Sequence, residues 1–465
     1  MNGHDITNLG YREGPLTGHA LRIAKRLSRN GMSNAEILQF LADVLANPLA
    51  HASDSRLTGL PAALIEAANR PYFIERKSPA PCRIWGEGLE AGALMQMTNA
   101  TRLPIAVRGA LMPDAHQGYG LPIGGVLATE NCVIPYAVGV DIACRMKLTV
   151  LDLPADKLES MRDRLAHVLR RETQFGTGAT LKRKEDHPVL DADWNITPLV
   201  RKLRAEKAPG QLGTSGSGNH FVEFGILTLP ADDLGLKAGN YVAVLSHSGS
   251  RGSGAMIAGH YSRLAQTLHP ELPPDLKYLA WLDLDSEPGQ EYMAAMNLMG
   301  DYAAANHAVI HRKIAKALDT KVLAGVENHH NFAWREEHDG RELIVHRKGA
   351  TPAGDGVLGV IPGSMASPGF VVRGKGVADS LNSASHGAGR AMSRTAARNS
   401  FRWAQIRPML EERGVQLLSA GIDENPFAYK DIEKVMAQQT DLVDTIARFD
   451  PKVVRMADEG ERPED

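Results

Sequence analysis

The segment from Val138 to Cys144 places two potential metal ligands close together beside a glycine. Asp141 and Cys144 are three residues apart, so both side chains can point to one place from a turn. A thiolate next to a carboxylate suits a divalent transition metal, and a thiolate can bridge two metal ions. The alternative for this segment alone is a buried cysteine that only packs.

Two glycine-rich loops carry further candidates. The first, residues 213–221, contains three glycines and His220, and glycines let a backbone approach a phosphate closely. The second, residues 246–254, follows an apolar run and contains His247 and Arg251, whose guanidinium can hold phosphate oxygens in a bidentate manner. Taken singly, the first is also consistent with a flexible loop and the second with a polar hairpin turn.

Two pairs of histidines need different interpretations. His329 and His330 are adjacent, and on an extended segment their side chains point to opposite sides, so at most one faces a given metal. His307 and His311 have the four-residue spacing of a zinc-binding helix, but Ala308 stands where that pattern needs a glutamate. We therefore interpret His307 and His311 as structural or surface residues.

The segment 385–394 contains a candidate nucleophile. His386 is followed by glycine, which leaves its imidazole open to approach, and histidine can act as a covalent nucleophile. Arg390 and Arg394 follow at helical spacing, which predicts one face directed toward a phosphate. The alternative is a histidine without a role at a helix start. From the residues alone, the sequence indicates a metal-dependent enzyme that acts on phosphates.

These side chains must be positioned by a mixed set of elements. Residues 1–80 are expected to form a helical extension, because Ser33 and Glu36 have capping-box spacing, apolar residues then follow at helical spacing, and Pro48 closes the segment. From Pro81 onward, short apolar runs alternate with glycine and proline, which is typical of strands and turns. The irregular order of strands and helices predicts the α+β class.

Longer elements are also predicted. Tyr241–Leu245 is expected to be a strand, residues 320–375 to form strands and turns, and residues 182–210 to be an insertion or long loop. The acidic residues 457–465 are expected to be a disordered tail. The predicted helices are Leu153–Arg171, Gln290–Leu318, Arg390–Arg413 and Ile432–Arg448.

Composition narrows the class of protein. The chain has 465 residues, 43% of them hydrophobic, and no apolar run approaches the ~20 residues of a membrane span. We therefore expect no membrane contact. Three cysteines cannot form a disulfide framework, so we expect a cytoplasmic protein. The net charge of −2 gives no overall signal for nucleic acid, so any RNA contact must come from a local basic patch.

Taken in order, the motifs resemble the RtcB-type RNA ligase family, from about Arg83 to Arg455. The segments that carry the resemblance are Asp141–Cys144, Gly218–Phe221, His247–Arg251, His330–Asn331, Arg347–Ala350, Pro362–Met365 and Ser385–Arg390. The resemblance implies a single large α+β catalytic body over residues 81–456, with mixed sheets flanked by helices around a deep active-site cleft. With its N-terminal extension, the chain resembles a divergent paralogue within the family.

The resemblance also implies a set of site residues. The nucleophile position is His386, and two metal ions, usually Mn²⁺ (Zn²⁺ or Co²⁺ being possible in crystals), share a bridging Cys144. The implied metal ligands are Asp141, Cys144, His220, His247 and His330. The positions implied for GTP are Asn219, Phe221, Glu223, Asn331, Ser364, Ala388 and Gly389. The positions implied for phosphates or RNA are Arg251, Lys348, Arg390 and Arg394.

Three positions depart from the family pattern. Ala457 stands where a lysine that holds guanine is common, Gly369 where a serine near the nucleotide is usual, and Arg145 where glycine is usual. Weaker discrimination of GTP from ATP is therefore expected.

The implied reaction joins RNA ends. GTP would guanylylate His386, and a 3′-phosphate or 2′,3′-cyclic-phosphate end would then be joined to a 5′-hydroxyl end, in tRNA splicing or RNA repair. The implied partners are broken tRNA or rRNA fragments and the helper protein archease. Two alternatives remain: a metal-dependent RNA-end phosphodiesterase or hydrolase, and a catalytically dead protein that binds RNA ends.

Overall fold

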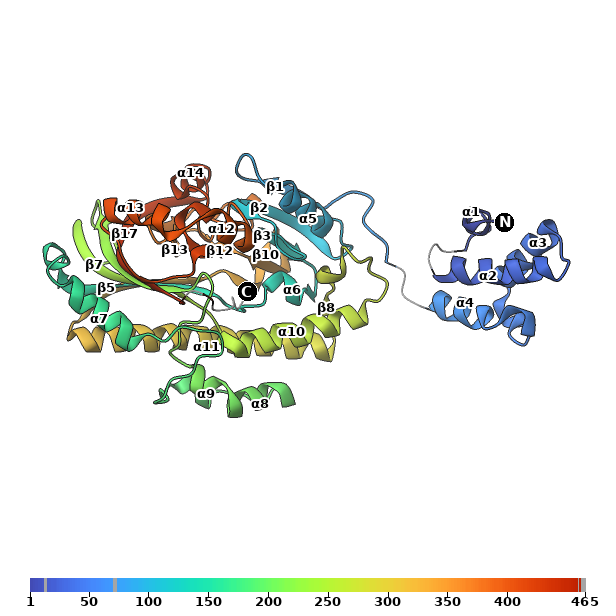
Figure 1. Cartoon of the computed structure of the whole chain (residues 1–465), viewed down its shortest axis with the longest axis horizontal. Coiled ribbons are helices and arrows are strands. Elements are labelled where there is room, and N and C mark those ends of the chain that lie inside the picture. The colour runs from blue at the N-terminus through green and yellow to red at the C-terminus, as the bar shows by residue number, and fades with distance from the viewer. Residues whose placement is uncertain (12–14, 70–72, 459, 461–465) are drawn as a thin grey trace. The chain divides into compact units, whose positions relative to one another are not determined.

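The computed structural model describes residues 1–11, 15–69, 73–458 and 460. The chain divides into two compact units, Met1–Ile74 and Glu75–Asp465 (Figure 1). Most of the predicted acidic tail, namely residues 459 and 461–465, lies outside the described residues.

The first unit is helical. Its α-helices are α1 (Gly3–Thr7), α2 (Pro15–Arg29), α3 (Asn34–Ala46) and α4 (Leu60–Asn69), with short 3₁₀ turns at Pro48–His51 and Ser55–Leu57. The predicted capping box is present, since the Ser33 and Glu36 side chains each bond to the other's backbone N–H. Apolar side chains such as Ile23, Leu41 and Leu57 form a core of this unit.

The second unit is built on two larger sheets. Its main sheet has the strand order β13-β14-β17-β6-β7-β5-β9, with β16 pairing β17. These strands are β5 (Arg145–Pro154), β6 (Phe221–Leu229), β7 (Gly239–Ser248), β9 (Val322–His329), β13 (Leu358–Ile361), β14 (Gly369–Gly374), β16 (Gln416–Ser419) and β17 (Val443–Met456). The predicted strand Tyr241–Leu245 lies within β7.

The second sheet has the order β1-β2-β3-β11-β10. Its strands are β1 (Cys82–Ile84), β2 (Ala106–His116), β3 (Ile123–Thr129), β10 (Asn331–His338) and β11 (Arg341–Lys348). Two small pairs complete the strands: β4 (Cys132–Val133) with β8 (Leu282–Asp283), and β12 (Ala350–Pro352) with β15 (Ser383–Ser385).

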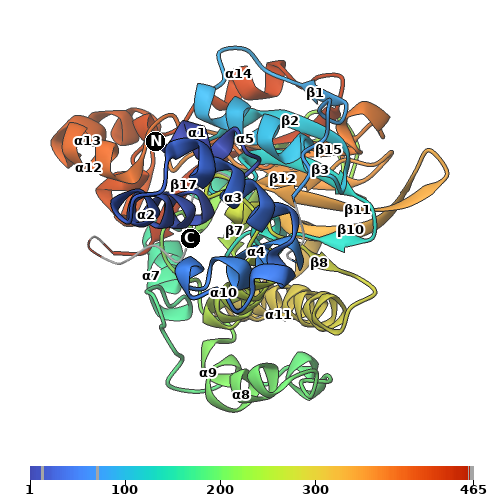
Figure 2. The ribbon, with the colours of Figure 1, turned by 90° about the vertical axis from the view of Figure 1, so that its right-hand side faces the viewer.

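Helices cover the sheets from both sides, as the two views show (Figures 1 and 2). The long helix α11 (Glu287–Leu318) contacts β5 and β7, and it packs against α10 (Arg251–Leu268) and α7 (Arg162–Glu172). The opposite side carries α12 (Arg394–Ser400), α13 (Trp403–Glu412) and α14 (Ile432–Ala437). Mixed sheets flanked by helices confirm the predicted α+β class.

The other α-helices of the second unit are α5 (Ala91–Thr101), α6 (Pro135–Val138), α8 (Pro198–Glu206) and α9 (Ala208–Gln211). Its 3₁₀ turns lie at Ala155–Lys157, Pro188–Asp191, Lys277–Leu279 (η5), Ala378–Ser380, Ile422–Glu424 and Pro426–Ala428. The predicted helix Gln290–Leu318 is confirmed within α11. Across the described ranges, no helix combines the length and apolar character that crossing a bilayer requires.

Several predicted boundaries are wrong. The predicted helix Ile432–Arg448 ends at Ala437, and the chain continues as β17, since Val443, Thr445 and Ile446 are β-branched residues that favour a sheet. The first part of the segment 153–171 is not α-helical, because β5 continues to Pro154 before a 3₁₀ turn.

Two further segments differ from their predictions. The predicted helix 390–413 is two helices that begin at Arg394 and Trp403. Ser393 is the N-cap of the first, and its side chain accepts a hydrogen bond from the backbone N–H of Ala396 at 3.1 Å. The predicted loop 182–210 contains the short helix α8, whose N-cap is Thr197.

The register of the main sheet brings four strand ends to one place. His247 of β7 pairs with Phe221 at the start of β6 and with Met146 at the start of β5. Arg145, also on β5, pairs with His329 at the end of β9. Residues that directly precede β5 and β6 or directly follow β9 therefore meet His247 at the same end of the sheet.

Candidate active site

The strand ends hold a buried cluster of metal-binding side chains. Cys144 Sγ lies 3.0 Å from His247 Nε2 and 3.3 Å from His220 Nε2. His247 Nε2 lies 3.2 Å from His330 Nε2, and His220 Nε2 lies 3.2 Å from a carboxylate oxygen of Asp141. All five side chains are buried. The structure thus brings the five residues predicted as metal ligands into one cluster.

The cluster consists of two overlapping groups that share Cys144. One is Cys144 with His247 and His330, and the other is Cys144 with Asp141 and His220. Each group offers ligand atoms within 4.8 Å of one another. Thiolate, imidazole and carboxylate ligands suit a divalent transition metal, so the donor set fits two ions with the thiolate between them.

Protonation in the cluster also fits metal binding. Burial lowers the pKa of His247 and of His330 well below the usual range, so both imidazoles are neutral near pH 7. Burial alone would raise the pKa of Asp141, but the hydrogen bond with His220 and the charge of Arg251 lower it to about 2. Neutral imidazoles and an ionised carboxylate are the forms that bind metals.

Neighbouring groups fix the orientation of these ligands. His247 Nδ1 lies 3.2 Å from the backbone oxygen of Asn219, and donation there leaves Nε2 as the atom that faces Cys144. The carboxylate of Asp141 accepts the backbone N–H of Ser250 at 3.1 Å. Gly249 is required at its position, because a Cβ there would lie 2.1 Å from the Asp141 carboxylate.

His386 lies beside this cluster and is held by a buried carboxylate. Its Nδ1 lies 2.7 Å from Asp114 Oδ2, and its backbone N–H donates to the same oxygen at 3.1 Å. Asp114 is completely buried. The imidazoles of His386 and His330 have ring centroids 4.9 Å apart. When its Nδ1–H donates a hydrogen bond to Asp114, His386 keeps its Nε2 lone pair for another reactant.

Asp114 is a site residue that the sequence analysis missed. Burial would raise the pKa of Asp114, but its hydrogen bond to His386 and the positive charge of Lys430 lower it, so the carboxylate stays ionised. The available signal was an aspartate and His116 within the apolar strand β2, followed by a glycine loop. His386, the partner of Asp114, is 272 residues away along the chain, so spacing alone could not identify the pair.

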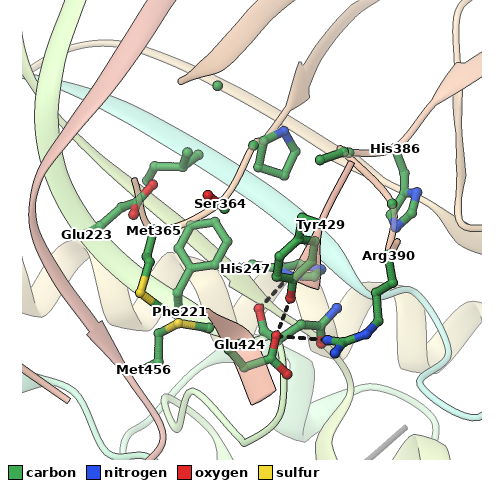
Figure 3. A pocket seen from close by; sticks show the side chains of 18 of the residues that line it. Phe221, Glu223, His247, Ser364, Met365, His386, Arg390, Glu424, Tyr429 and Met456 are labelled. Atoms are coloured by element: carbon green, nitrogen blue, oxygen red, sulfur yellow. Dashed lines mark hydrogen bonds and ion pairs between the residues drawn. The ribbon is translucent and has the colours of Figure 1, made fainter. Parts of the chain in front are cut away.

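A cavity opens from His386 and His247 and reaches between β6, β17 and the loop after β13 (Figure 3). The predicted site residues that line it are Asn219, Phe221, Glu223, His247, Ser364, His386, Ala388, Gly389, Arg390 and Arg394. Most of the predicted nucleotide positions therefore share one cavity with the predicted nucleophile.

One end of the cavity is mainly apolar. Figure 3 shows Phe221, Met365 and Met456 together there, with Glu223 nearby. Burial raises the pKa of the Glu223 carboxyl well above its usual range. Ala457, where a lysine is common in the family, packs instead into the apolar cluster beneath α7.

The arginines at the other end are held by carboxylates. Arg390 Nη1 lies 3.4 Å from Glu424, whose carboxylate also bonds to Arg394 and to the hydroxyl of Tyr429. Arg394 Nη1 further bonds to Asp423 at 3.2 Å. Arg390 precedes the helix that begins at Arg394, so the predicted helical spacing of the two is wrong. They nevertheless meet at the cavity because both bond to the Asp423–Glu424 turn.

Three of the residues predicted to contact the nucleotide, phosphates or RNA are not part of the cavity lining within the described residues. Asn331 accepts the Gly349 N–H at 2.8 Å and donates to the Asp141 backbone oxygen, so it braces the metal-binding turn. Arg251 donates to His220 Nδ1 at 3.0 Å, behind the metal cluster. Lys348 Nζ donates to the backbone oxygen of Tyr119 at 2.6 Å, and burial lowers the pKa of Lys348 to about 7.

His307 and His311 are structural residues, as predicted from the missing glutamate. Both are buried on α11, and the hydroxyl of Ser246 lies 2.7 Å from His307 Nδ1 and 2.7 Å from His311 Nε2. His329 points away from His330, as predicted, and packs against Trp334 with ring centroids 4.9 Å apart. These three histidines therefore support the strands rather than the metal cluster.

Comparisons with known proteins agree with this architecture. The family model described as tRNA-splicing ligase RtcB matches residues 96–457. The chain is 35% identical over 406 residues to the RNA-splicing ligase RtcB of Escherichia coli (strain K12), covering 81% of this chain and 97% of that protein. It is 31% identical to the tRNA-splicing ligase RtcB of Nanoarchaeum equitans, covering 82% and 96%, and 34% identical to the RNA-splicing ligase RtcB of Mycobacterium tuberculosis, covering 77% and 99%. This chain therefore belongs to the RtcB family of tRNA-splicing ligases.

Proposed function

We propose that this protein is a GTP- and metal-dependent RNA ligase that joins 3′-phosphate or 2′,3′-cyclic-phosphate ends to 5′-hydroxyl ends, with His386 as the nucleophile. The observation that carries the proposal is the pairing of buried Asp114 with His386, which lines one cavity and lies beside the metal-binding cluster. A nucleophile, an orienting carboxylate and metal ligands in one place are the parts that nucleotidyl transfer needs.

The cavity would hold GTP with its base between Phe221 and the methionines and its phosphates toward His386. Glu223 is the buried polar group at the base end, and Ser364, Ala388 and Gly389 also line the space between the ends. Arg390 and Arg394 supply positive charge on the phosphate side, since their guanidinium groups reach the cavity from the turn that holds them.

The cluster of Asp141, Cys144, His220, His247 and His330 would hold two cations, since its two ligand groups share Cys144. Bound there, the cations would offset charge that develops on phosphate oxygens. Arg251 and Asn331 would support the metal ligands through hydrogen bonds. Arg251 would orient His220, and Asn331 would hold the turn that carries Asp141. Mn²⁺ is the proposed metal, by resemblance to the family.

His386 would begin the reaction from its neutral form. Its Nε2 lone pair attacks the α-phosphorus of GTP, the bond to the β-phosphate oxygen breaks, and pyrophosphate leaves. Asp114 keeps the proton on Nδ1 and stabilises the positive charge that the ring gains in this step. The product is a phosphoramidate between His386 and GMP.

Two transfers would complete the ligation. An oxygen of the RNA 3′-phosphate attacks the phosphorus of the bound GMP, and the P–N bond to His386 breaks. The 5′-hydroxyl oxygen then attacks the 3′-phosphorus, its proton passes to solvent, and GMP leaves. A 2′,3′-cyclic phosphate would first be opened by water to the 3′-phosphate.

The proposed setting is the cytoplasm, with broken tRNA or rRNA as substrate and archease as a helper protein. The three cysteines Cys82, Cys132 and Cys144 are free thiols, which fits a reducing compartment.

A ligation assay tests the proposal. The purified protein is incubated with GTP, Mn²⁺ and two oligoribonucleotides, one ending in a 3′-phosphate and the other beginning with a 5′-hydroxyl. The expected product is the joined strand, formed only when GTP is present. Opening of a cyclic phosphate without any joined product would support a hydrolase instead, and binding without either reaction would support an RNA-end binding protein.

A further inference from the structure

Three tyrosines form a cluster that the proposed chemistry does not use. Tyr119, Tyr136 and Tyr278 come from the loop after β2, from α6 and from η5. Their ring centroids lie 6.3 Å apart for Tyr119 and Tyr136, 5.5 Å for Tyr119 and Tyr278, and 4.8 Å for Tyr136 and Tyr278. Tyr119 is 63% exposed, which is unusual for a large aromatic side chain in a cluster. We refer to these three residues as the tyrosine platform.

The tyrosine platform lies next to the active site. Tyr119 is on the loop that joins β2 to β3, and both ends of this loop, His116 and Ile123, line the nucleotide cavity. Lys348, which bonds to the backbone of Tyr119, is followed by Gly349, where a Cβ would lie 3.2 Å from Cε1 of His386. The platform therefore continues outward from the position of the nucleophile.

Two lysine side chains lie against rings of the tyrosine platform. Lys348 Nζ lies 5.1 Å from the ring centroid of Tyr136, and Lys277 Nζ lies 4.8 Å from that of Tyr278. Cations over aromatic rings are attracted to the ring faces, and they can also contact phosphates that pass nearby. Aromatic faces with cations are the combination by which proteins bind single-stranded nucleic acid.

The loop that carries Tyr119 is held in place before any ligand binds. Gln96 of α5 bonds to both backbone groups of Gly118, donating to its oxygen at 2.6 Å and accepting its N–H at 3.0 Å. Gly120 has φ +68°, and a Cβ there would lie 2.7 Å from the backbone oxygen of Tyr278. A surface that is already ordered loses less entropy when a ligand binds.

We propose that the tyrosine platform stacks the bases of single-stranded RNA next to the broken end, while the exposed Lys277 contacts an adjoining phosphate. This proposal rests on the proposed ligase function and adds a binding surface to it. It makes the nucleotides beside the break part of the recognised substrate. Because every base has an aromatic face, the platform would accept many sequences, but it requires that the end be unpaired.

The test compares Tyr119→Leu with Tyr119→Phe, which keeps the aromatic face. The readout is the KM for a single-stranded oligoribonucleotide that ends in a 3′-phosphate. Tyr119→Leu is expected to raise this KM about five- to a hundredfold, whereas Tyr119→Phe should stay near the wild-type value. With 2-aminopurine next to the 3′-phosphate, binding should quench fluorescence in wild type and Tyr119→Phe more strongly than in Tyr119→Leu.

Equal KM values and equal quenching in the leucine and phenylalanine variants would overturn the proposal, provided that their unfolding temperatures match. A second control uses an RNA whose terminal nucleotides lack bases. If Tyr119→Leu raised the KM for this RNA as much as for the normal RNA, the result would also contradict stacking. Failure of the ligase function is a separate result, because it would appear in the wild-type protein as an absence of GMP bound to His386, which requires no RNA.

Discussion

The Nδ1 atom of His386 lies 2.7 Å from the carboxylate of Asp114, which is completely buried and also accepts the backbone N–H of His386. An ionised carboxylate in this position fixes both the tautomer and the direction of the imidazole. In the proposed reaction it would leave Nε2 as the nucleophilic atom and favour the positive charge that the ring acquires on attack. Asp114 would therefore position the proposed nucleophile.

The first prediction concerns this carboxylate. Asp114→Asn should lower the rate of GMP transfer to the protein by about a hundredfold or more, because an amide that donates to Nδ1 moves the proton of His386 to Nε2. The rate is measured with labelled GTP in a single turnover. Asp339→Asn is the control, since Asp339 forms an exposed ion pair with Arg108. Similar rates in both variants would contradict the role of Asp114.

The second prediction separates metal-binding from packing cysteines. Cys144→Ala should abolish ligation and strongly reduce bound metal, because its thiol belongs to both ligand groups. Cys132→Ala is the matched control, as Cys132 is also buried but bonds to Asp283 away from the cluster. Bound metal is measured by mass spectrometry of the elements after dialysis. Metal retained by Cys144→Ala but lost by Cys132→Ala would show that the ligands are assigned wrongly.

The third prediction concerns His307. From the sequence alone, His307→Ala is expected to be nearly silent. In the structure, His307 contacts the hydroxyl of Ser246 and the backbone oxygen of Ser248, the two neighbours of His247. His307→Ala should therefore keep bound metal but lower the free energy of unfolding by about 1–3 kcal/mol, because buried polar groups lose their partner. Urea unfolding and metal analysis on the same sample check both parts, and unchanged stability would contradict this account.

The sequence was sufficient to predict candidate metal ligands that stand within a short, recognisable motif. Cys144, His220, His247 and His330 each lie at a strand end, where a local pattern of glycine and a ligand residue is visible. Asp114 was missed, because its significance depends on a partner 272 residues away.

Other differences between the prediction and the structure also have physical causes. The segment after Ala437 forms a strand because pairing with β14 and β6 stabilises its β-branched residues, and no local propensity reveals these partners. Arg390 lies outside the expected helix because the N-cap Ser393 starts that helix later. Its position at the cavity depends instead on Glu424, which a spacing argument could not supply.

The fourth prediction concerns the choice between GTP and ATP. Arg455 donates to backbone oxygens of Leu169 and Thr173, and Lys430 donates to those of Pro113 and Ala115, so neither replaces the missing lysine at the base end. Without a charged hydrogen bond from that lysine, this protein should prefer GTP over ATP about ten- to a hundredfold less strongly than family members that have the lysine.

Competition between the two nucleotides for attachment to the protein measures this preference. Met456→Lys places an ammonium in the cavity near Glu223 and should raise the GTP preference, whereas Met456→Leu should not. A strong GTP preference in the wild type, unchanged by Met456→Lys, would show that another group recognises guanine.

The fifth prediction concerns stability and pH. His346 is fully buried, accepts the Ile134 N–H at 2.9 Å, and lies 3.1 Å from the Leu127 oxygen, and burial lowers its pKa to about 4. Between pH 6.5 and 4 the unfolded chain binds a proton that the folded protein does not, so stability falls as pH falls. The contribution of His346 is about 1.4 kcal/mol per pH unit. His346→Gln should show a correspondingly smaller loss of unfolding free energy between pH 7 and 5, and an unchanged slope would contradict the assignment.

The most direct test of the account is the covalent attachment of GMP to His386. Wild-type protein incubated with labelled GTP and Mn²⁺ should acquire label that is stable in alkali and released by acid, as expected for a P–N bond. His386→Ala should acquire none and should join no RNA ends, yet it should still bind metal, because His386 is not among the five proposed ligands. Acid-labile GMP on His386→Ala, or ligation by that variant, would contradict the central claim.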